Sequence, residues 1–100
     1  MLLERRTVSR KTPLDGRLEI TKRAAQRFDD LDGAFDVELA GDRVRGTIGT
    51  MECTCRGVDY PHVHYFIESP AFKQLAAGDE VDLDLDPTTH TVRVEHRRPV

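Results

Sequence analysis

Long hydrophobic runs are absent from this chain of 100 residues, which also shows no internal repeat and no low-complexity linker. A helix that spans a membrane needs about 20 consecutive apolar residues, and no run in the sequence approaches that length. The segment 1–6 becomes charged at Glu4, so it lacks the apolar stretch of a signal peptide. We therefore expect a cytoplasmic protein without a membrane partner.

Cysteine is scarce, and its placement argues against a disulfide bond. The two cysteines are Cys53 and Cys55. Two positions apart on a strand, their Cβ atoms would lie about 7 Å from each other, whereas a disulfide requires about 3.8 Å. Two thiols fit a reducing compartment, in agreement with a cytoplasmic location.

Positive charge is in short supply over most of the chain. Residues 1–30 carry a net charge of +3, whereas residues 31–60 and 61–100 carry −3 each, and the whole chain carries −3. An acidic body with a basic first third argues against the broad nonspecific binding to nucleic acid that uniformly basic proteins show. A localised nucleic-acid contact through residues 1–30 stays open.

Alternation of apolar and polar residues predicts a small protein built mainly from strands. A chain in which 38% of the residues are hydrophobic has enough apolar material for one domain with one core. Thr21 is placed to cap a short helix over 22–28, and Pro70 opens a second helical turn over 70–75. The alternating segments predict strands at 17–20, at 35–39, from Val44 through Ile48 to Cys55 with a β-bulge near 49–50, at 61–69, from Val81 to Leu85, and at 91–95.

These elements predict an α+β fold that is mainly β, a small, partly open β-barrel of about six strands with two short helices. The barrel would occupy residues 14–97 as a single domain. Residues 1–13 are polar and basic, so we expect a basic N-terminal arm that is either loose or forms an edge strand. Asp82, Asp84 and Asp86 would line the solvent face of another edge strand, where repeated charge prevents edge-to-edge pairing.

Two segments resemble a known fold family. Residues 17–28, which begin Arg-Leu-Glu-Ile-Thr-Lys, are similar to the strand and helix that read roughly Arg-Leu-x-Ile-Pro-Lys in the DNA-binding pseudobarrel. Residues 69–75, followed by Gly78-Asp79-Glu80-Val81, are similar to its second helix and to the Gly-Asp-x-Val start of its next strand. This fold occurs in plant B-three transcription factors and in effector domains of some restriction enzymes. Arg45-Gly46-Thr47-Ile48, together with Gly78-Asp79-Glu80-Val81, also resembles a bacterial barrel family of unknown function.

The resemblance implies a binding module rather than an enzyme, with DNA as its partner. In the pseudobarrel, basic residues on barrel loops and strands reach the major groove and the phosphates, which here points to Arg17, Lys22 and Arg23. The middle of this chain departs from the family, because it carries cysteines and histidines in place of the family's aromatic pattern.

The most distinctive chemistry lies in the sequence Cys53-Thr54-Cys55, six further residues, and then His62-Val63-His64. Residues two apart on a strand share a face, and the residues between the two pairs have the composition of a turn. A symmetric hairpin would place Cys53 opposite His64 and Cys55 opposite His62. Thiolate sulfur and imidazole nitrogen are ligands that zinc prefers, so Cys53, Cys55, His62 and His64 form a candidate zinc site.

Two other interpretations of this cluster stay open. Cys53 and Cys55 could belong, with Met51 and Phe66, to an apolar core face, and the cluster would then be purely structural. A cysteine with a cross-strand histidine is also a minimal nucleophile–base pair, but the sequence indicates no third orienting residue and no oxyanion element. We expect a small non-enzymatic binding module, for DNA or alternatively for zinc.

Overall fold

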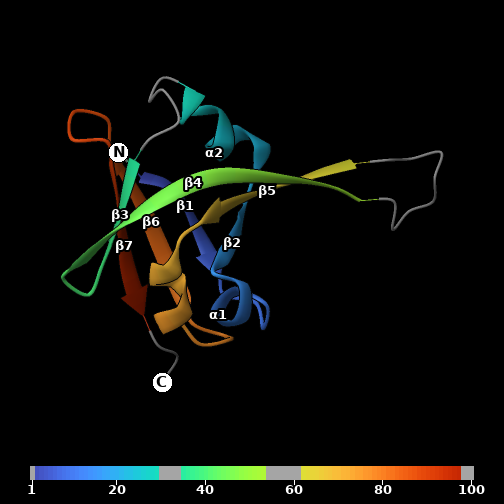
Figure 1. Cartoon of the computed structure of the whole chain (residues 1–100), viewed down its shortest axis with the longest axis horizontal. Helices are drawn as coiled ribbons and strands as arrows, with labels where there is room; N and C mark the ends of the chain where they lie inside the picture. The colour runs from blue at the N-terminus through green and yellow to red at the C-terminus, as the bar shows by residue number, and fades with distance from the viewer. Residues whose placement is uncertain (1, 30–34, 54–61, 98–100) are drawn as a thin grey trace.

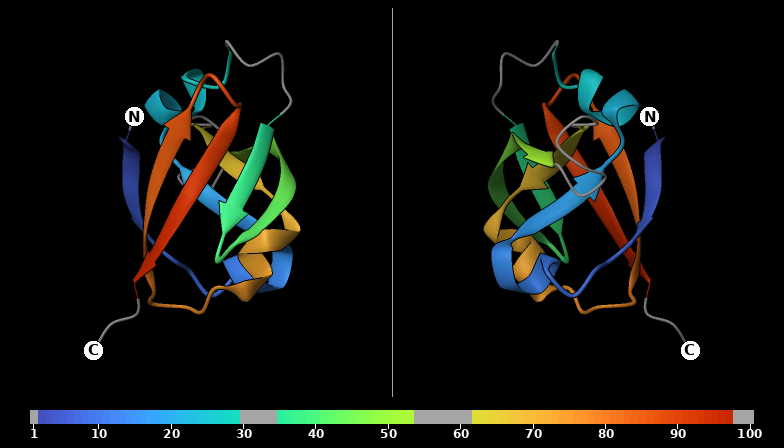
Figure 2. Two further views of the ribbon diagram at one scale, coloured as in Figure 1. Left: turned by 90° about the vertical axis from the view of Figure 1, so that its left-hand side faces the viewer. Right: turned by 90° about the vertical axis from the view of Figure 1, so that its right-hand side faces the viewer.

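The computed structural model describes residues 2–29, 35–53 and 62–97 of the chain. Its elements are, in chain order, β1 (Leu2–Thr7), α1 (Thr12–Asp15), β2 (Arg17–Ile20), α2 (Lys22–Gln26), β3 (Phe35–Leu39), β4 (Asp42–Cys53), β5 (His62–Glu68), the 3-10 helix η2 (Pro70–Gln74), β6 (Glu80–Asp86) and β7 (Thr91–Arg97). The strands follow the order β1-β6-β7-β3-β4-β5-β2. The sheet curls into a nearly closed barrel, with α2 at one end and α1 and η2 at the other (Figure 1, Figure 2). The mainly β, barrel-like fold predicted from the sequence is confirmed.

The N-terminal segment contributes a strand and a helix of its own. β1 pairs with β6 at one edge of the sheet, so residues 2–7 form an edge strand and the described strands number seven rather than about six. α1 follows from a local signal that the sequence contains. Pro13 occupies its first turn, and Gly16 ends it in the left-handed conformation, at a φ of 69°. None of the helices in the described residues is long and apolar enough to cross a membrane.

Inward-facing apolar side chains form one core inside the barrel. The apolar residues that alternate along β3, β6 and β7 are all buried, as expected of strands with one face in the core. Each fully buried aliphatic or aromatic side chain stabilises the fold by about 1.5–3 kcal/mol relative to an exposed one. The largest apolar side chains that are fully buried are those of Phe72, Leu18, Leu39, Ile67, Leu83 and Leu85.

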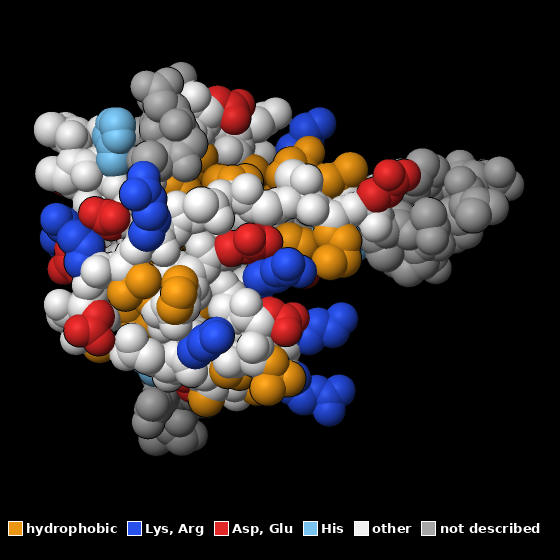
Figure 3. All heavy atoms as spheres, in the orientation of Figure 1, with side chains coloured by type: hydrophobic (Ala, Val, Ile, Leu, Met, Phe, Trp, Pro, Cys, Tyr) orange, Lys and Arg blue, Asp and Glu red, His pale blue; other side chains and the backbone are white. Residues whose placement is uncertain are grey.

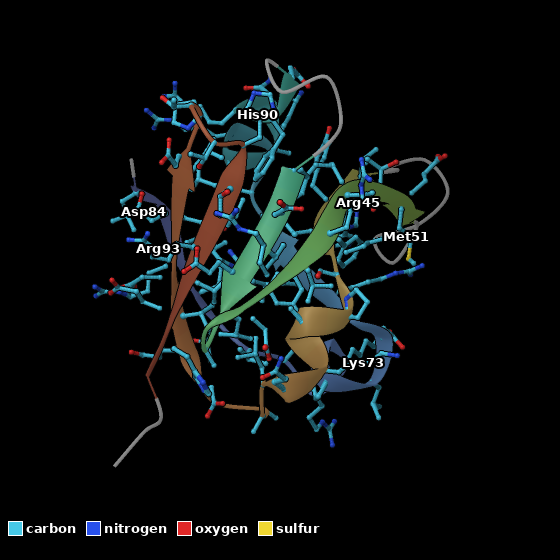
Figure 4. All side chains as sticks on the ribbon, turned by 60° about the vertical axis from the view of Figure 1, so that its left-hand side comes forward. Arg45, Met51, Lys73, Asp84, His90 and Arg93 are labelled. Carbon is cyan, nitrogen blue, oxygen red and sulfur yellow. The ribbon has the colours of Figure 1, made fainter. Side chains whose placement is uncertain are left out.

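The aspartates of β6 do not line an edge strand, and that prediction is wrong. β6 lies between β1 and β7. Asp82 is buried, and its carboxylate accepts a hydrogen bond from Nε of Arg5 in β1 over 2.6 Å. Asp84 lies opposite Arg93 of β7, and Figure 4 shows both on these neighbouring strands. Asp82 and Asp84 therefore face arginines of the strands on either side, an arrangement that stabilises cross-strand pairing. Asp84 and Asp86 are exposed, so for these two the predicted solvent face is correct and only the edge position is wrong.

The longest strand, β4, joins the two halves of the barrel. Its residues 42–46 pair with β3 and its residues 47–53 pair with β5. The second pairing forms the β4–β5 ribbon (residues 47–53 and 62–68), which extends beyond the barrel (Figure 1). The register of this ribbon is regular, so the β-bulge predicted near 49–50 is wrong. Ile48 packs against the core, whereas Met51 lies on the other face and is 47% exposed, which explains the change of parity without a bulge.

The corner between β2 and α2 is held in place by Thr21. Its hydroxyl donates a hydrogen bond to a carboxylate oxygen of Glu4 over 2.6 Å and accepts one from the backbone N–H of Ala24 over 3.1 Å. Thr21 therefore caps α2 as predicted, although the helix ends at Gln26 rather than at residue 28. Because β1 and β2 are the two edge strands, the contact with Glu4 also joins the open edges of the barrel.

Two glycines of β4 provide a matched test of this packing. A methyl group at Gly46 would lie 2.7 Å from the ring of Phe35 and 2.8 Å from a methyl group of Val37, both in the core. The atoms nearest to a methyl group at Gly49 belong to the side chain of Glu68, which can move aside by giving up its partly exposed ion pair with Arg17. We expect Gly46→Ala to lower the free energy of unfolding by about 1–3 kcal/mol, the usual cost of overpacking, and Gly49→Ala to lower it much less. Urea titrations followed by circular dichroism measure both changes, and equal losses would contradict the described packing.

Candidate functional site

Strands β2, β5 and β4 lie side by side, and they present alternate residues to the core and to the outer surface. Ile67 of β5 is fully buried, opposite Leu18 of β2 on one side and Ile48 of β4 on the other. Successive residues of a strand point to opposite faces. His62 and His64 therefore lie on the outer face of the β4–β5 ribbon, and the predicted placement of Ile67 on the face opposite the histidines is confirmed.

The register of the hairpin differs by two residues from the predicted one. His64 lies opposite Met51, and His62 lies opposite Cys53, whereas a symmetric turn would pair His64 with Cys53. The register of a strand is set by the need to bury one of its faces. Here the pairing of Ile48 with Ile67 places both side chains on the core side. The symmetry of the turn does not contain this information. The side chain of Cys53 and all of Cys55 lie outside the described residues, so the thiol half of the site stays a prediction.

The side chains of the two histidines converge. Nε2 of His62 lies 3.0 Å from Nε2 of His64, and the rings meet edge to face with their centroids 4.7 Å apart. At that distance one nitrogen donates a proton and the other accepts it. Nδ1 of His64 lies 2.9 Å from a carboxylate oxygen of Glu19. The carboxylate can only accept, so Nδ1 carries a proton and Nε2 of a neutral His64 is the acceptor from His62.

Glu19 is the site residue that sequence reasoning missed. It lies 45 positions from His64 in the chain, and the two meet because β2 pairs with β5, with Glu19 opposite Phe66. The alternation of residues 17–20 indicates that Glu19 faces outward, but no local pattern indicates which strand lies beside it. In the structure, Glu19 orients the ring of His64 so that Nε2 is directed at His62.

A cavity of about 510 Å³ opens beside the histidines. It lies where β2 ends and the chain turns at Thr21 into α2. Lys22 on this wall is exposed and makes no ion pair or hydrogen bond with another described residue. The complete lining consists of Glu19, Ile20, Thr21, Lys22, His62, Val63, His64 and Tyr65. The residues that line the cavity therefore include two histidines, one glutamate and one lysine.

The histidine pair could chelate a metal ion, but the described residues supply only those two ligands. Among them, no group of three or more histidine, cysteine, aspartate or glutamate side chains is arranged to hold a metal. Two imidazole nitrogens suit zinc, copper and nickel better than magnesium or calcium, which prefer oxygen ligands. A metal held by this pair would be a borderline transition metal, with its other positions filled by further ligands.

The sequence also allowed the face that carries His62 and His64 to belong to the apolar core, together with Met51 and Phe66. That alternative is wrong for Met51 and Phe66. Met51, which lies opposite His64, is 47% exposed, and Phe66 is only partly buried. The buried face of the β4–β5 ribbon is the opposite one, which carries Ile67. His62 and His64 thus lie on a surface that a solute can reach.

The basic residues expected at a DNA contact lie on two elements. Nε of Arg17 in β2 lies 3.1 Å from a carboxylate oxygen of Glu68. Lys22 and Arg23 lie next to each other at the start of α2, and both are exposed. Arg27, which the sequence prediction did not include, lines the same small cavity as Arg23. On the face drawn in Figure 3, basic and acidic side chains are interspersed.

Comparisons of this chain with protein-family models, with curated proteins and with solved structures gave no match.

Proposed function

We propose that this protein binds a transition-metal ion, zinc foremost, through the Nε2 atoms of His62 and His64. The observation that carries the proposal is the 3.0 Å separation of these two nitrogens. Zinc binds imidazole nitrogen at about 2.1 Å, so two nitrogens on one ion lie about 3.0 Å apart at a right angle and about 3.4 Å apart at the tetrahedral angle. An ion can therefore replace the proton that the two rings share with little movement of the strand.

The contact with Glu19 supports the same proposal. Metal-binding histidines almost always donate their other ring N–H to a carboxylate, a backbone carbonyl or water, which fixes the tautomer and raises the basicity of the ligating nitrogen. Glu19 makes this contact with Nδ1 of His64 at 2.9 Å. Nε2 of the neutral ring then carries the lone pair that a metal requires, and a metal would take the place of the proton that this lone pair accepts from His62.

Two protein nitrogens leave the coordination of zinc incomplete, since zinc sites usually have four ligands. In one form of the site, water completes the coordination and the ion stays open to exogenous molecules. In the other form, the thiolates of Cys53 and Cys55 complete it, as predicted from the sequence, and the ion is closed. The double variant Cys53→Ser, Cys55→Ser separates the two forms, because only the open site keeps its zinc without the thiols.

Zinc binding to untagged protein, measured by equilibrium dialysis, tests the histidine pair. We expect about one zinc ion per chain, and a loss of affinity of more than about 100-fold in His62→Ala and in His64→Ala, because changes to supporting residues alone commonly cost about 10- to 100-fold. His90→Asn is the matched control. His90 lies at the turn between β6 and β7, away from Met51 (Figure 4), and its φ of 50° is one that asparagine tolerates. Equal zinc affinity in all four proteins would contradict the proposal.

Glu19→Ala tests the role of the carboxylate. We expect zinc affinity to fall about tenfold, the lower end of the range for a supporting residue, because the Glu19 side chain is 48% exposed. Glu52→Ala removes the same charge from the other face of the β4–β5 ribbon, since Glu52 lies opposite Val63, and we expect no change there. A fall of the same size in both variants would assign the effect to net charge rather than to the contact with His64.

DNA binding is a second candidate, favoured by the exposed cations at the start of α2. We propose that Lys22 and Arg23 contact phosphates, because neither makes an ion pair or hydrogen bond with another described residue. The observed order of strands and helices from β2 to β7 also follows the order expected from the resemblance to the DNA-binding pseudobarrel. Arg17 is a weaker contact, since Glu68 already neutralises it.

Fluorescence polarisation with a labelled duplex tests this second candidate. Each phosphate contact contributes about −0.9 to the slope of log affinity against log salt concentration. We therefore expect the double variant Lys22→Gln, Arg23→Gln to make this slope shallower by about 2. Lys73→Gln, in η2 at the other end of the barrel, is the control and should leave the slope unchanged. Absence of duplex binding at low salt and high protein concentration would reject DNA as a partner.

A further inference from the structure

The cavity beside the histidines is larger than a metal ion requires. It is open to solvent and has a volume of about 510 Å³, against roughly 30 Å³ for one water molecule in the liquid. A zinc ion held by two imidazoles alone keeps positions that exchangeable ligands occupy. The cavity therefore has room for a molecule that binds directly to the ion.

Lys22 supplies a positive charge on the wall that α2 contributes. The backbone at this position is fixed, because the preceding residue, Thr21, contacts both Glu4 and the N–H of Ala24. The side chain of Lys22 is exposed, lines the same cavity as His62 and His64, and makes no ion pair or hydrogen bond within the described residues. Among the described residues, Lys22 is thus the cation closest to hand for a ligand bound beside the histidines.

The charges around the cavity favour a ligand with two negative charges. A divalent metal and Lys22 together bring three positive charges, and Glu19 removes one of them. A carboxylate or a phosphodiester carries a single negative charge, whereas a phosphate monoester carries between about −1.5 and −2 at pH 7. We infer that the site binds a terminal phosphate group, with one oxygen on the metal and another on Lys22. This inference rests on the open form of the proposed metal site and adds the ligand class to it.

Calorimetric titration of the zinc-loaded full chain with phenylphosphate tests the inference. We expect phenylphosphate to bind at least about tenfold more tightly to the zinc-loaded protein than to the metal-free protein. Methyl phenyl phosphate and benzoate, which carry one charge each, should bind at least about tenfold more weakly than phenylphosphate, since a charge-assisted hydrogen bond is worth that factor or more. If inorganic phosphate binds as tightly as phenylphosphate, the free ion is identified as the ligand. If phenylphosphate binds more tightly, a phosphate ester is identified.

Variants of neighbouring residues separate this inference from the metal site. Lys22→Gln should lower phenylphosphate affinity about tenfold, the loss of one charge-assisted contact, and leave zinc affinity unchanged. Arg23→Gln removes the next cation of α2, which lines a different cavity, and should change neither. The phosphate site would be overturned, and the metal site left intact, by either of two results. In one, the protein binds zinc but binds phenylphosphate no more tightly than methyl phenyl phosphate and benzoate. In the other, Lys22→Gln leaves phenylphosphate affinity unchanged. Failure to bind zinc at all would overturn both.

Discussion

The pairing of β2 with β5 is the constraint on which the candidate site depends. Leu18 lies opposite Ile67 and Ile20 lies opposite Tyr65, and Leu18, Ile20 and Ile67 are buried. Since alternate residues of a strand face opposite ways, burying these side chains turns Glu19 outward beside His64. A slip of one residue would reverse every side chain of β2 and remove the carboxylate from the histidine. The geometry of the outer face is thus a consequence of packing on the inner face.

The same pairing explains why a cavity opens beside the histidines. Ile20 with Tyr65 is the last pair between β2 and β5, after which the chain turns at Thr21 and leaves the sheet as α2. His64 and His62 lie just beyond this last pair, where β5 continues with β4 as its partner in the β4–β5 ribbon. The point at which the ribbon leaves the barrel is therefore also the point at which imidazole, carboxylate and ammonium groups meet.

Local patterns predicted much of the fold. The alternation of residues 35–39 identified a strand and its buried face, and Thr21 was recognised as a helix cap, because both depend on residues close together in the chain. The helix α1 was missed although Pro13 and Gly16 mark its two ends. The strand at residues 2–7 was only one of two alternatives for the N-terminal segment.

The parts that sequence reasoning could not supply depend on distant residues. Arg5 contacts Asp82 across 77 positions and Glu19 contacts His64 across 45, and no periodicity indicates which strands become neighbours. The symmetric hairpin register is wrong by two residues for the same reason, because the pairing of Ile48 with Ile67, and not the symmetry of the turn, determines the register. The prediction that the two histidines share a face holds in any register, because they lie two apart on one strand. A shift of two residues also keeps them on the same face as Met51, which lies opposite His64.

The central claim is that Nε2 of His62 and Nε2 of His64 bind one ion together. Long-range ¹H–¹⁵N NMR spectra of the histidine side chains during a zinc titration test it most directly. The account predicts that the Nε2 resonances of His62 and His64 shift together and saturate at about one equivalent, while those of His90 stay in place. Zinc saturation that leaves both resonances of the pair unchanged, or shifts only one of them, would contradict it.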